Sequence, residues 1–265
     1  MENNILDKIV VKKLQEIESA KATVSVEELK GSEFFSRKCF SFPAFLTAAD
    51  RTGIIAEFKR QSPSKGVINN LVKVADVTQG YALAGASALS VLTDSSFFGG
   101  HKDDLIEARK SNKIPLLRKD FMLDEYQVYE AKAWGADIIL LIAAILSPER
   151  IKALASLAKS LTLNVLLEVH NLEELERSLC DDLDAVGINN RNLGNFLVTT
   201  QHSYDLINHI PSKFLKISES GISDPTTIMQ LKRAGFDGFL IGENFMKEPN
   251  PGEAMQKFVS QMSAG

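Results

Sequence analysis

Cysteine is scarce in this chain. Only Cys39 and Cys180 occur among its 265 residues, and neither lies in a Cys-x-x-Cys or Cys/His spacing. A disulfide framework and a zinc site are therefore not indicated, and we expect both side chains to be reduced, buried thiols. We expect no metal ion in the site.

Positive charge is not in excess. The 34 acidic residues outnumber the 30 lysines and arginines, and the formal net charge is −4. Binding to a phosphate backbone needs a clustered excess of Lys and Arg, so nucleic acid is not an expected partner.

Long apolar runs are missing. The longest, Ile138 to Leu146, is too short to span a bilayer, and the N-terminal sequence MENNILDKIVVKKLQEIE carries charges throughout, unlike a secretory signal. The 45% hydrophobic and 24% charged residues are typical of a soluble globular protein. We expect a cytoplasmic protein without a membrane partner. Walker A and G-x-G-x-x-G motifs are absent too, so no nucleoside triphosphate or dinucleotide site is indicated.

A repeated pattern is present instead: an apolar run with a polar end, followed by a helical stretch. Such runs begin at Ile54, Ala88, Pro115, Asp137, Asn164, Ala185, Phe214 and Gly238. Eight alternating units with nearly continuous apolar strands predict an α/β fold with a parallel sheet covered by helices, and eight is the number that closes a TIM barrel. The length also allows two small domains, but no Gly/Pro/Ser-rich linker divides the chain.

Residues 1–48 precede the repeat and predict a helical extension. An amphipathic helix is indicated by apolar residues at helical spacing, namely Ile5, Ile9, Val10, Leu14 and Ile17. A second short helix is expected over Val26 to Leu29, with Ser25 and Glu28 forming a capping box. We therefore expect one domain, in which 1–48 form the helical extension and 49–265 the (βα)8 TIM barrel.

Helix boundaries within the repeat are marked by proline and glycine. Asp224-Pro225 precedes TTIMQLKRA and Gly235 follows it, which predicts a helix that begins at proline and ends before glycine. Gly85 and Gly135 likewise predict helix ends just before the next run.

Polar residues at the ends of the runs are the first candidates for an active site, which in a TIM barrel lies at the carboxyl ends of the strands. Glu57 and Lys59 are two residues apart, so on a strand both side chains leave the same face, and a predicted loop from Ser62 to Gly66 follows. The other ends add Thr93, Asp94, Lys119, Asp120, Phe121, Glu168, Asn189, Arg191, Glu219, Ser220, Gly242 and Glu243. Two lysines and several glutamates at one cavity mouth, partly buried by the preceding apolar residues, indicate general acid–base chemistry.

Some polar residues near these ends are expected to be structural. On a strand Asp120 points opposite to Lys119, so we expect it to hold a neighbouring element in place. Three of the four histidines fall outside the strand ends, and His170 lies two residues past Glu168 in a predicted loop. We interpret all four, His101, His170, His202 and His209, as structural or surface residues.

The last two runs predict an anion site. SESGIS from Ser218 precedes a helix, and LIGEN from Leu240 contains a second glycine turn. Backbone N–H groups of such turns bind anions, and in barrels this place commonly holds a phosphate, although the glycines could serve tight turns alone.

Several long motifs closely resemble the indole-3-glycerol phosphate synthase family. They are EFKRQSPSKG, LLRKDFMLDEYQVYEAKAWGAD, LLEVHNLEEL, GINNRNL and SESGI, and the resemblance runs in order from Ile54 to Met246. It implies conversion of 1-(2-carboxyphenylamino)-1-deoxyribulose 5-phosphate to indole-3-glycerol phosphate, with loss of carbon dioxide and water.

The resemblance also implies roles for individual residues. Lys119 is implied to be the general acid at the ribulose carbonyl, and Glu168 the general base. Lys59 would hold the substrate carboxylate and is one of the two lysines that could act in dehydration, with Glu57 orienting it. The remaining implied contacts are Asn189, Glu219 and Arg191 with substrate hydroxyls and amine, Ser62, Ser220, Gly221, Gly242 and Glu243 with the phosphate end, and Phe98 and Phe121 with the anthranilate ring. The partner implied is a small-molecule substrate, with no cofactor, and a monomer is favoured over an oligomer.

Two other functions remain open from the sequence. Another phosphate-binding barrel of the tryptophan pathway, to which the resembled family also belongs, would share the anion site. Examples are phosphoribosylanthranilate isomerase and a tryptophan synthase α subunit. A non-catalytic sugar-phosphate binding protein would share the fold, because fold does not determine function. A binder, however, has no need for a paired acid and base.

Overall fold

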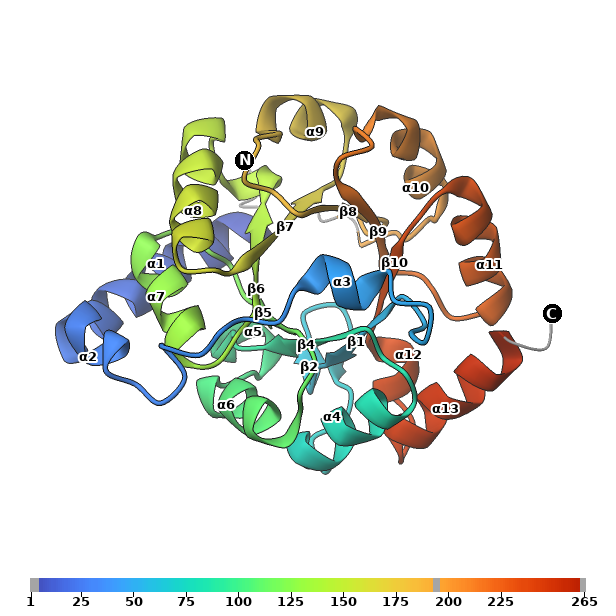
Figure 1. Cartoon of the computed structure of the whole chain (residues 1–265), viewed down its shortest axis with the longest axis horizontal. Helices are drawn as coiled ribbons and strands as arrows, with labels where there is room; N and C mark the ends of the chain where they lie inside the picture. The colour runs from blue at the N-terminus through green and yellow to red at the C-terminus, as the bar shows by residue number, and fades with distance from the viewer. Residues whose placement is uncertain (1–4, 193–195, 263–265) are drawn as a thin grey trace.

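The computed structural model describes residues 5–192 and 196–262. In this part of the chain, eight parallel strands form a closed barrel in the order β1-β10-β9-β8-β7-β6-β5-β4 (Figure 1). Their bounds are β1 Ile54–Phe58, β4 Ala88–Leu92, β5 Leu116–Lys119, β6 Ile138–Ile142, β7 Asn164–Val169, β8 Ala185–Asn189, β9 Leu215–Glu219 and β10 Gly238–Ile241. Each strand lies within one of the eight apolar runs, so the predicted (βα)8 barrel is confirmed.

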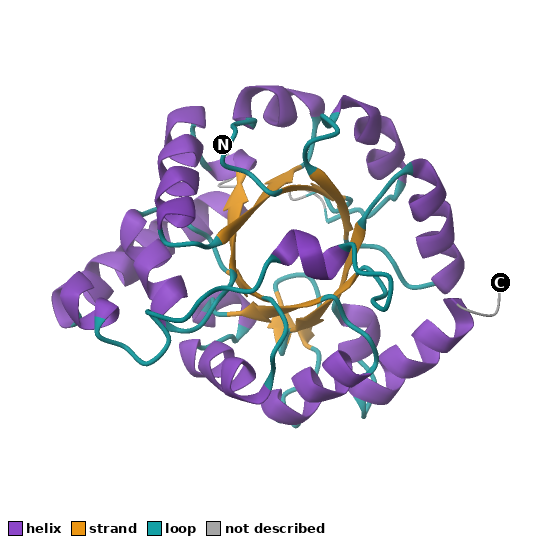
Figure 2. Cartoon of the chain, in the orientation of Figure 1, coloured by secondary structure: helices purple, strands orange, loops and turns teal. Residues whose placement is uncertain are grey.

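Helices surround the barrel and connect its strands (Figure 2). They are α4 Val74–Leu83, α5 Ser95–Phe98, α6 Lys102–Ser111, α7 Glu125–Ala133, α8 Pro148–Ser160, α9 Leu172–Ser178, α10 Gln201–Leu206, α11 Pro225–Ala234, α12 Glu243–Met246 and α13 Pro251–Met262, with 3-10 turns at Ala143–Ile145 and Ile207–His209. Helix α11 begins at Pro225 and ends before Gly235, whose φ of 104° is left-handed, as the proline and glycine pattern predicts.

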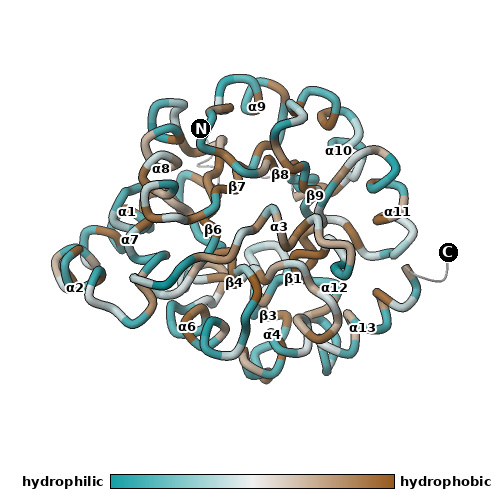
Figure 3. The backbone as a smooth tube through the Cα atoms, in the orientation of Figure 1, coloured by the Kyte–Doolittle hydropathy of each residue, from teal (hydrophilic) through white to brown (hydrophobic). Residues whose placement is uncertain are grey.

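Apolar side chains pack in two layers, because successive residues of a strand point to opposite faces. Ile54 and Ala56 of β1 point outward to the covering helices, whereas Ile55 points into the barrel together with Leu117, Leu166 and other inward residues. Hydrophobic residues are concentrated along the strands (Figure 3). Apolar side chains thus fill the interior of the barrel below the carboxyl ends of the strands, and polar side chains occupy the carboxyl end.

Three helices precede the barrel: α1 Ile5–Thr23, α2 Val26–Lys30 and α3 Phe42–Leu46. The first two match the predicted helices, and the Ser25–Glu28 capping box is present. Helix α3 is a finding that the sequence did not predict. It lies across the end of the barrel where the strands begin (Figure 2), and Phe42 and Leu46 complete the interior packing.

Three smaller features differ from, or add to, the expectations. The predicted loop from Ser62 to Gly66 is the tip of a small hairpin, in which β2 Gln61–Ser62 pairs with β3 Gly66–Val67. Cys39 and Cys180 are free thiols, but both are only half-buried, so the expectation of full burial was wrong. None of the described helices is long and apolar enough to cross a membrane.

Candidate active site

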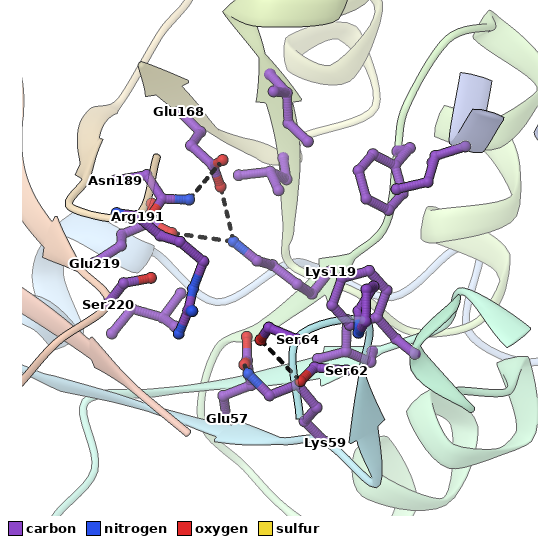
Figure 4. A pocket seen from close by; sticks show the side chains of 18 of the residues that line it. Glu57, Lys59, Ser62, Ser64, Lys119, Glu168, Asn189, Arg191, Glu219 and Ser220 are labelled. Atoms are coloured by element: carbon purple, nitrogen blue, oxygen red, sulfur yellow. Dashed lines mark hydrogen bonds and ion pairs between the residues drawn. The ribbon is translucent and has the colours of Figure 1, made fainter. Parts of the chain in front are cut away.

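The carboxyl ends of the strands surround an open cavity lined by both charged and apolar side chains (Figure 4). A second cavity adjoins it. The residues to which the family resemblance gives a role all line one or both: Glu57, Lys59, Ser62, Phe98, Lys119, Phe121, Glu168, Asn189, Arg191, Glu219, Ser220, Gly221, Gly242 and Glu243.

The charged residues reach the cavity because they share the inward face of their strands. Leu117 and Leu166 are buried inside the barrel, and Lys119 and Glu168 follow two residues later on the same face. Neighbouring strands then bring the ends to one level, since Asn189 pairs in register with Glu219.

Lys119 is the centre of the charge arrangement. Its Nζ lies 3.0 Å from Glu168 Oε2 and 3.0 Å from Glu219 Oε2 (Figure 4). Burial alone would lower the pKa of this ammonium, but the charges of Glu168, Glu219 and then Glu57 outweigh burial and hold the pKa above its usual value. Lys119 is therefore a positively charged group in the cavity.

The two carboxylates beside Lys119 have opposite pKa shifts. Burial would raise the pKa of Glu168, but Lys119, then His170, and a 3.0 Å hydrogen bond from Asn189 Nδ2 keep it below its usual value. In Glu219, burial dominates and the charge of Glu168 adds to it, against the charge of Lys119, so the pKa rises to about 7. Glu168 is thus the ionised carboxylate of the pair, and Glu219 exchanges a proton near neutral pH.

Two glycines leave space for the carboxylates of Glu219 and Glu57. A Cβ on Gly187 of β8 would collide with Glu219 Oε1, and one on Gly242 would lie 2.8 Å from Glu57 Oε1. A side chain at either position would push a glutamate out of its place. These two glycines therefore serve close approach, and only one of them was noticed from the sequence.

Glu57 and Lys59 form a second ion pair, on the side of the cavity away from Glu168 (Figure 4). Lys59 Nζ lies 2.8 Å from Glu57 Oε1, and Ser90 donates to Glu57 Oε2 at 3.2 Å. The side chain of Glu57 is buried, whereas that of Lys59 is 17% exposed. Glu57 therefore fixes the position of the Lys59 ammonium, which remains partly exposed to the open cavity.

The apolar slot has walls from two parts of the chain. The ring centroids of Phe98 and Phe121 lie 6.0 Å apart, and both residues line the cavity. Ile5, Leu6 and Ile9 of α1 also line this cavity, although the sequence analysis did not place them in the site. The sequence shows the apolar face of that helix, but it does not show that this face meets the cavity.

The second cavity has the features of an anion site. Ser220 and Gly221 at the end of β9 have left-handed φ values of 68° and 77°, and Gly242 and Glu243 begin α12. The side chains of Lys65 and Arg191 also line it, together with that of Lys247. Glu243 lies 3.6 Å from Lys65 and 3.9 Å from Arg191, so it orders these cations around the two turns.

Three strand-end candidates lie outside this catalytic arrangement. Asp94 caps α5 and pairs with Lys13 of α1, and Thr93 donates a 2.6 Å hydrogen bond to Asp120. Asp120 in turn binds Lys13 and Arg118. The expectation that Asp120 holds a neighbouring element is confirmed, and that element is α1.

His170 lies closer to Glu168 than the sequence suggested. Its Nε2 is 3.4 Å from Glu168 Oε1, and its Nδ1 is 3.2 Å from Glu174 Oε2. The four-residue spacing of His170 and Glu174 was the signal available in the sequence. Within residues 5–192 and 196–262, no group of three or more His, Cys, Asp or Glu side chains is arranged to hold a metal ion.

The chain resembles known proteins in family, sequence and fold. A family model described as indole-3-glycerol phosphate synthase matches residues 6–258. An indole-3-glycerol phosphate synthase of Bacteroides thetaiotaomicron is 46% identical over 256 residues, with 97% of this chain and 98% of the relative covered. One of Polaromonas sp. is 45% identical over 256 residues, covering 96% and 97%. A chain of the tryptophan synthase complex from Pyrococcus furiosus has a TM-score of 0.60 at 15% identity over 82% of this chain and 99% of that one, which shows a shared fold.

Proposed function

The chain belongs to the indole-3-glycerol phosphate synthase family, and we propose that Lys119, Lys59 and Glu168 carry out its chemistry. It is a carboxy-lyase of tryptophan biosynthesis that converts 1-(2-carboxyphenylamino)-1-deoxyribulose 5-phosphate to indole-3-glycerol phosphate, carbon dioxide and water. The observation that carries the residue assignment is the ammonium of Lys119, 3.0 Å from each of two buried carboxylates in the cavity.

Ring closure needs an acid at the carbonyl oxygen. The aromatic carbon that bears the carboxylate attacks the ribulose carbonyl, a carbon–carbon bond forms, and the carbonyl oxygen takes a proton from Lys119. A raised pKa keeps Lys119 charged until the substrate arrives, and the buried setting strengthens its pull on the developing oxyanion. Glu219, with its pKa of about 7, is close enough to return a proton to Lys119.

Decarboxylation follows in the same cavity. The bond from the ring to the carboxylate breaks, its electron pair restores the aromatic ring, and carbon dioxide leaves. Lys59 holds that carboxylate, and its pairing with Glu57 at 2.8 Å limits how tightly it does so. A flexible ammonium suits this step better than a bidentate arginine, because the carboxylate must be released.

Dehydration completes the indole. A base removes a proton from the methylene carbon beside the nitrogen, and the hydroxyl leaves as water after protonation by a lysine. Glu168 is the base in this proposal, since its pKa is held low and Asn189 orients its carboxylate. Lys59 and Lys119 both lie within the cavity and are the two candidates for the acid of this step.

Substrate binding divides between two ends of the cavity. The phosphate is proposed to bind at Ser220, Gly221, Gly242 and Glu243, with Ser62 and the cation of Arg191 beside it. The anthranilate ring is proposed to lie between Phe98 and Phe121 and the apolar face of α1. The substrate then extends across the barrel mouth with its reacting carbon near Lys119.

Indole fluorescence tests the assignment. Mixing the purified protein with the carboxyphenylamino-deoxyribulose phosphate is expected to give product, and Lys119→Met is expected to lower kcat by about 10² to 10⁴-fold, the usual contribution of a positioned acid. Substrate affinity measured on the folded Lys119→Met variant separates catalysis from binding. Turnover by that variant close to the wild-type rate would refute the role of Lys119.

Quaternary state and location are separate proposals. We propose that the chain acts as a monomer, because one chain supplies every residue assigned above to the site. We also propose that it acts in the cytoplasm, because it belongs to a biosynthetic family. Sedimentation equilibrium at assay concentrations tests the monomer, and a stable dimer at those concentrations would refute it.

A further inference from the structure

His170 connects the proposed base to the first turn of the following helix. It lies just after β7, with its side chain 13% exposed. Its backbone N–H donates to Glu174 Oε2 at 2.8 Å, and its Nδ1 lies 3.2 Å from the same oxygen. Glu174 is itself held by Asn171, which donates to Glu174 Oε1 at 2.9 Å. The imidazole is therefore fixed from one side by a carboxylate that has its own support.

The other ring nitrogen faces the catalytic carboxylate. His170 Nε2 is buried, forms no hydrogen bond within the described residues, and lies 3.4 Å from Glu168 Oε1. Nδ1–H bonded to Glu174 and Nε2–H directed at Glu168 together describe the doubly protonated ring. A small rotation of the Glu168 carboxylate would complete the hydrogen bond at Nε2.

We propose that His170, held by Glu174, is a positioning residue that orients Glu168 and maintains its negative charge during the reaction. This inference rests on the proposed role of Glu168 as the base. His170 does not line the cavity, so it acts through Glu168 and not on the substrate.

The charges around the imidazole favour its protonated form. Burial would lower the pKa of His170, but the bond to Glu174 and the charges of Glu168 and Glu219 raise it. Lys119 contacts the other oxygen of the Glu168 carboxylate. The carboxylates around the imidazole therefore favour the protonated form of the ring.

The need for a second cation arises from the reaction itself. Once Lys119 has given its proton to the carbonyl oxygen, it is neutral and no longer offsets the burial of Glu168. The pKa of Glu168 would then rise, and the carboxylate would be a candidate to take up a proton before the base step. The imidazolium of His170 remains in place through this stage, because it is not part of the proton transfer.

Two substitutions of His170 separate charge from hydrogen bonding. His170→Leu removes both, and we expect kcat to fall about tenfold with KM within about twofold of wild type, since substrate contacts are intact. His170→Gln keeps a donor without charge, and we expect it to recover kcat to within about threefold at pH values above the optimum. In both variants the acid limb of the pH profile of kcat/KM is expected to move to higher pH, because Glu168 loses a cation that lowers its pKa.

A matched pair on the next helix gives the control. Glu174→Gln removes the carboxylate that holds the His170 ring. It is expected to move the acid limb of the kcat/KM profile to higher pH as well, by a smaller amount than the His170 variants. Glu173→Gln removes an equal charge one residue away, at an exposed position, and is expected to leave the profile unchanged. An equal shift in Glu173→Gln would refute the specific contact.

The outcome that overturns the proposal is distinct from failure of the proposed function. A His170→Leu variant that keeps the wild-type kcat and pH profile, or that changes only its melting temperature, would show a structural role alone. Wild type and Glu168→Gln are measured in the same series. Absence of wild-type turnover would instead refute the activity, and an active Glu168→Gln would refute the base assignment.

Discussion

Lys13 of α1 lies 2.9 Å from Asp120, the residue that directly follows Lys119. Both side chains are buried, and Lys13 also contacts Asp94 at 3.0 Å and Glu16 at 2.7 Å. Burial would lower the pKa of Lys13, but Asp120 and then Asp94 raise it, so the ion pairs persist at physiological pH. The first helix is thus joined to the end of β5, and it brings Ile5, Leu6 and Ile9 to the cavity.

Breaking this connection is expected to weaken both folding and substrate binding. Lys13→Met leaves Asp94 and Asp120 with one cation fewer in a buried setting, which typically costs about 3–5 kcal/mol. We expect urea unfolding to show a loss of that order and KM to rise, because the apolar wall from α1 is displaced. Lys8→Met, at an exposed position of the same helix, is the control. Equal stability of the two variants would contradict the role of Lys13.

Glu219 is expected to make stability depend on pH. Its folded pKa of about 7 lies above its ordinary value near 4.5, so the folded state binds a proton between these values that the unfolded state has released. Stability therefore falls as the pH rises from about 4.5 to about 7, and the effect of this group is level above 7. Compared with Glu219→Gln, the wild type is expected to lose about 2–3 kcal/mol of stability over this range, on the order of 1.36 kcal/mol per pKa unit. Urea titrations of both proteins at pH 5, 6, 7 and 8.5 test this, and parallel curves would contradict it.

Gly187→Ala is expected to damage the site while preserving the barrel. The added Cβ would collide with the Glu219 carboxylate, and Glu219 would lose its contact with Lys119. We expect kcat to fall by at least about tenfold, since a small misplacement of a catalytic group is costly. Gly31→Ala, whose Cβ would meet nothing closer than 3.5 Å, is expected to retain activity. A fully active Gly187→Ala would show that Glu219 is not needed where it lies.

Arg191 is expected to act on the phosphate end of the substrate. It lines both cavities and lies near Glu243, beside the two turns. Arg191→Leu is expected to raise KM about tenfold or more with a smaller change in kcat, because the contact is the same in the ground and transition states. The dephosphorylated substrate is the control: on it, wild type and variant are expected to have similar kcat/KM. An equal loss on both substrates would contradict a phosphate contact.

Local patterns were enough to predict the barrel and the strand positions from which polar side chains enter its cavity. Each apolar run became a strand, and the alternation of faces in Leu117 and Lys119, or Leu166 and Glu168, is a property of the extended backbone. The Ser25–Glu28 capping box formed for the same reason, because its partners are three residues apart. The family motifs added roles that spacing alone would have left open.

The tertiary structure alone decided which distant residues meet. Helix α3 is five residues long, too short to be marked by periodicity, and it is held by burial of Phe42 and Leu46 in the barrel. Lys13 reads as one more charge on an amphipathic helix until Asp94 and Asp120 surround it. His170 was interpreted as structural because its sequence neighbours do not reveal how close its Nε2 lies to Glu168. The sequence by itself determined what depends on neighbours along the chain, whereas the partners of buried charges were decided by packing, because a buried charge is stabilised by whatever the fold brings within a few ångströms.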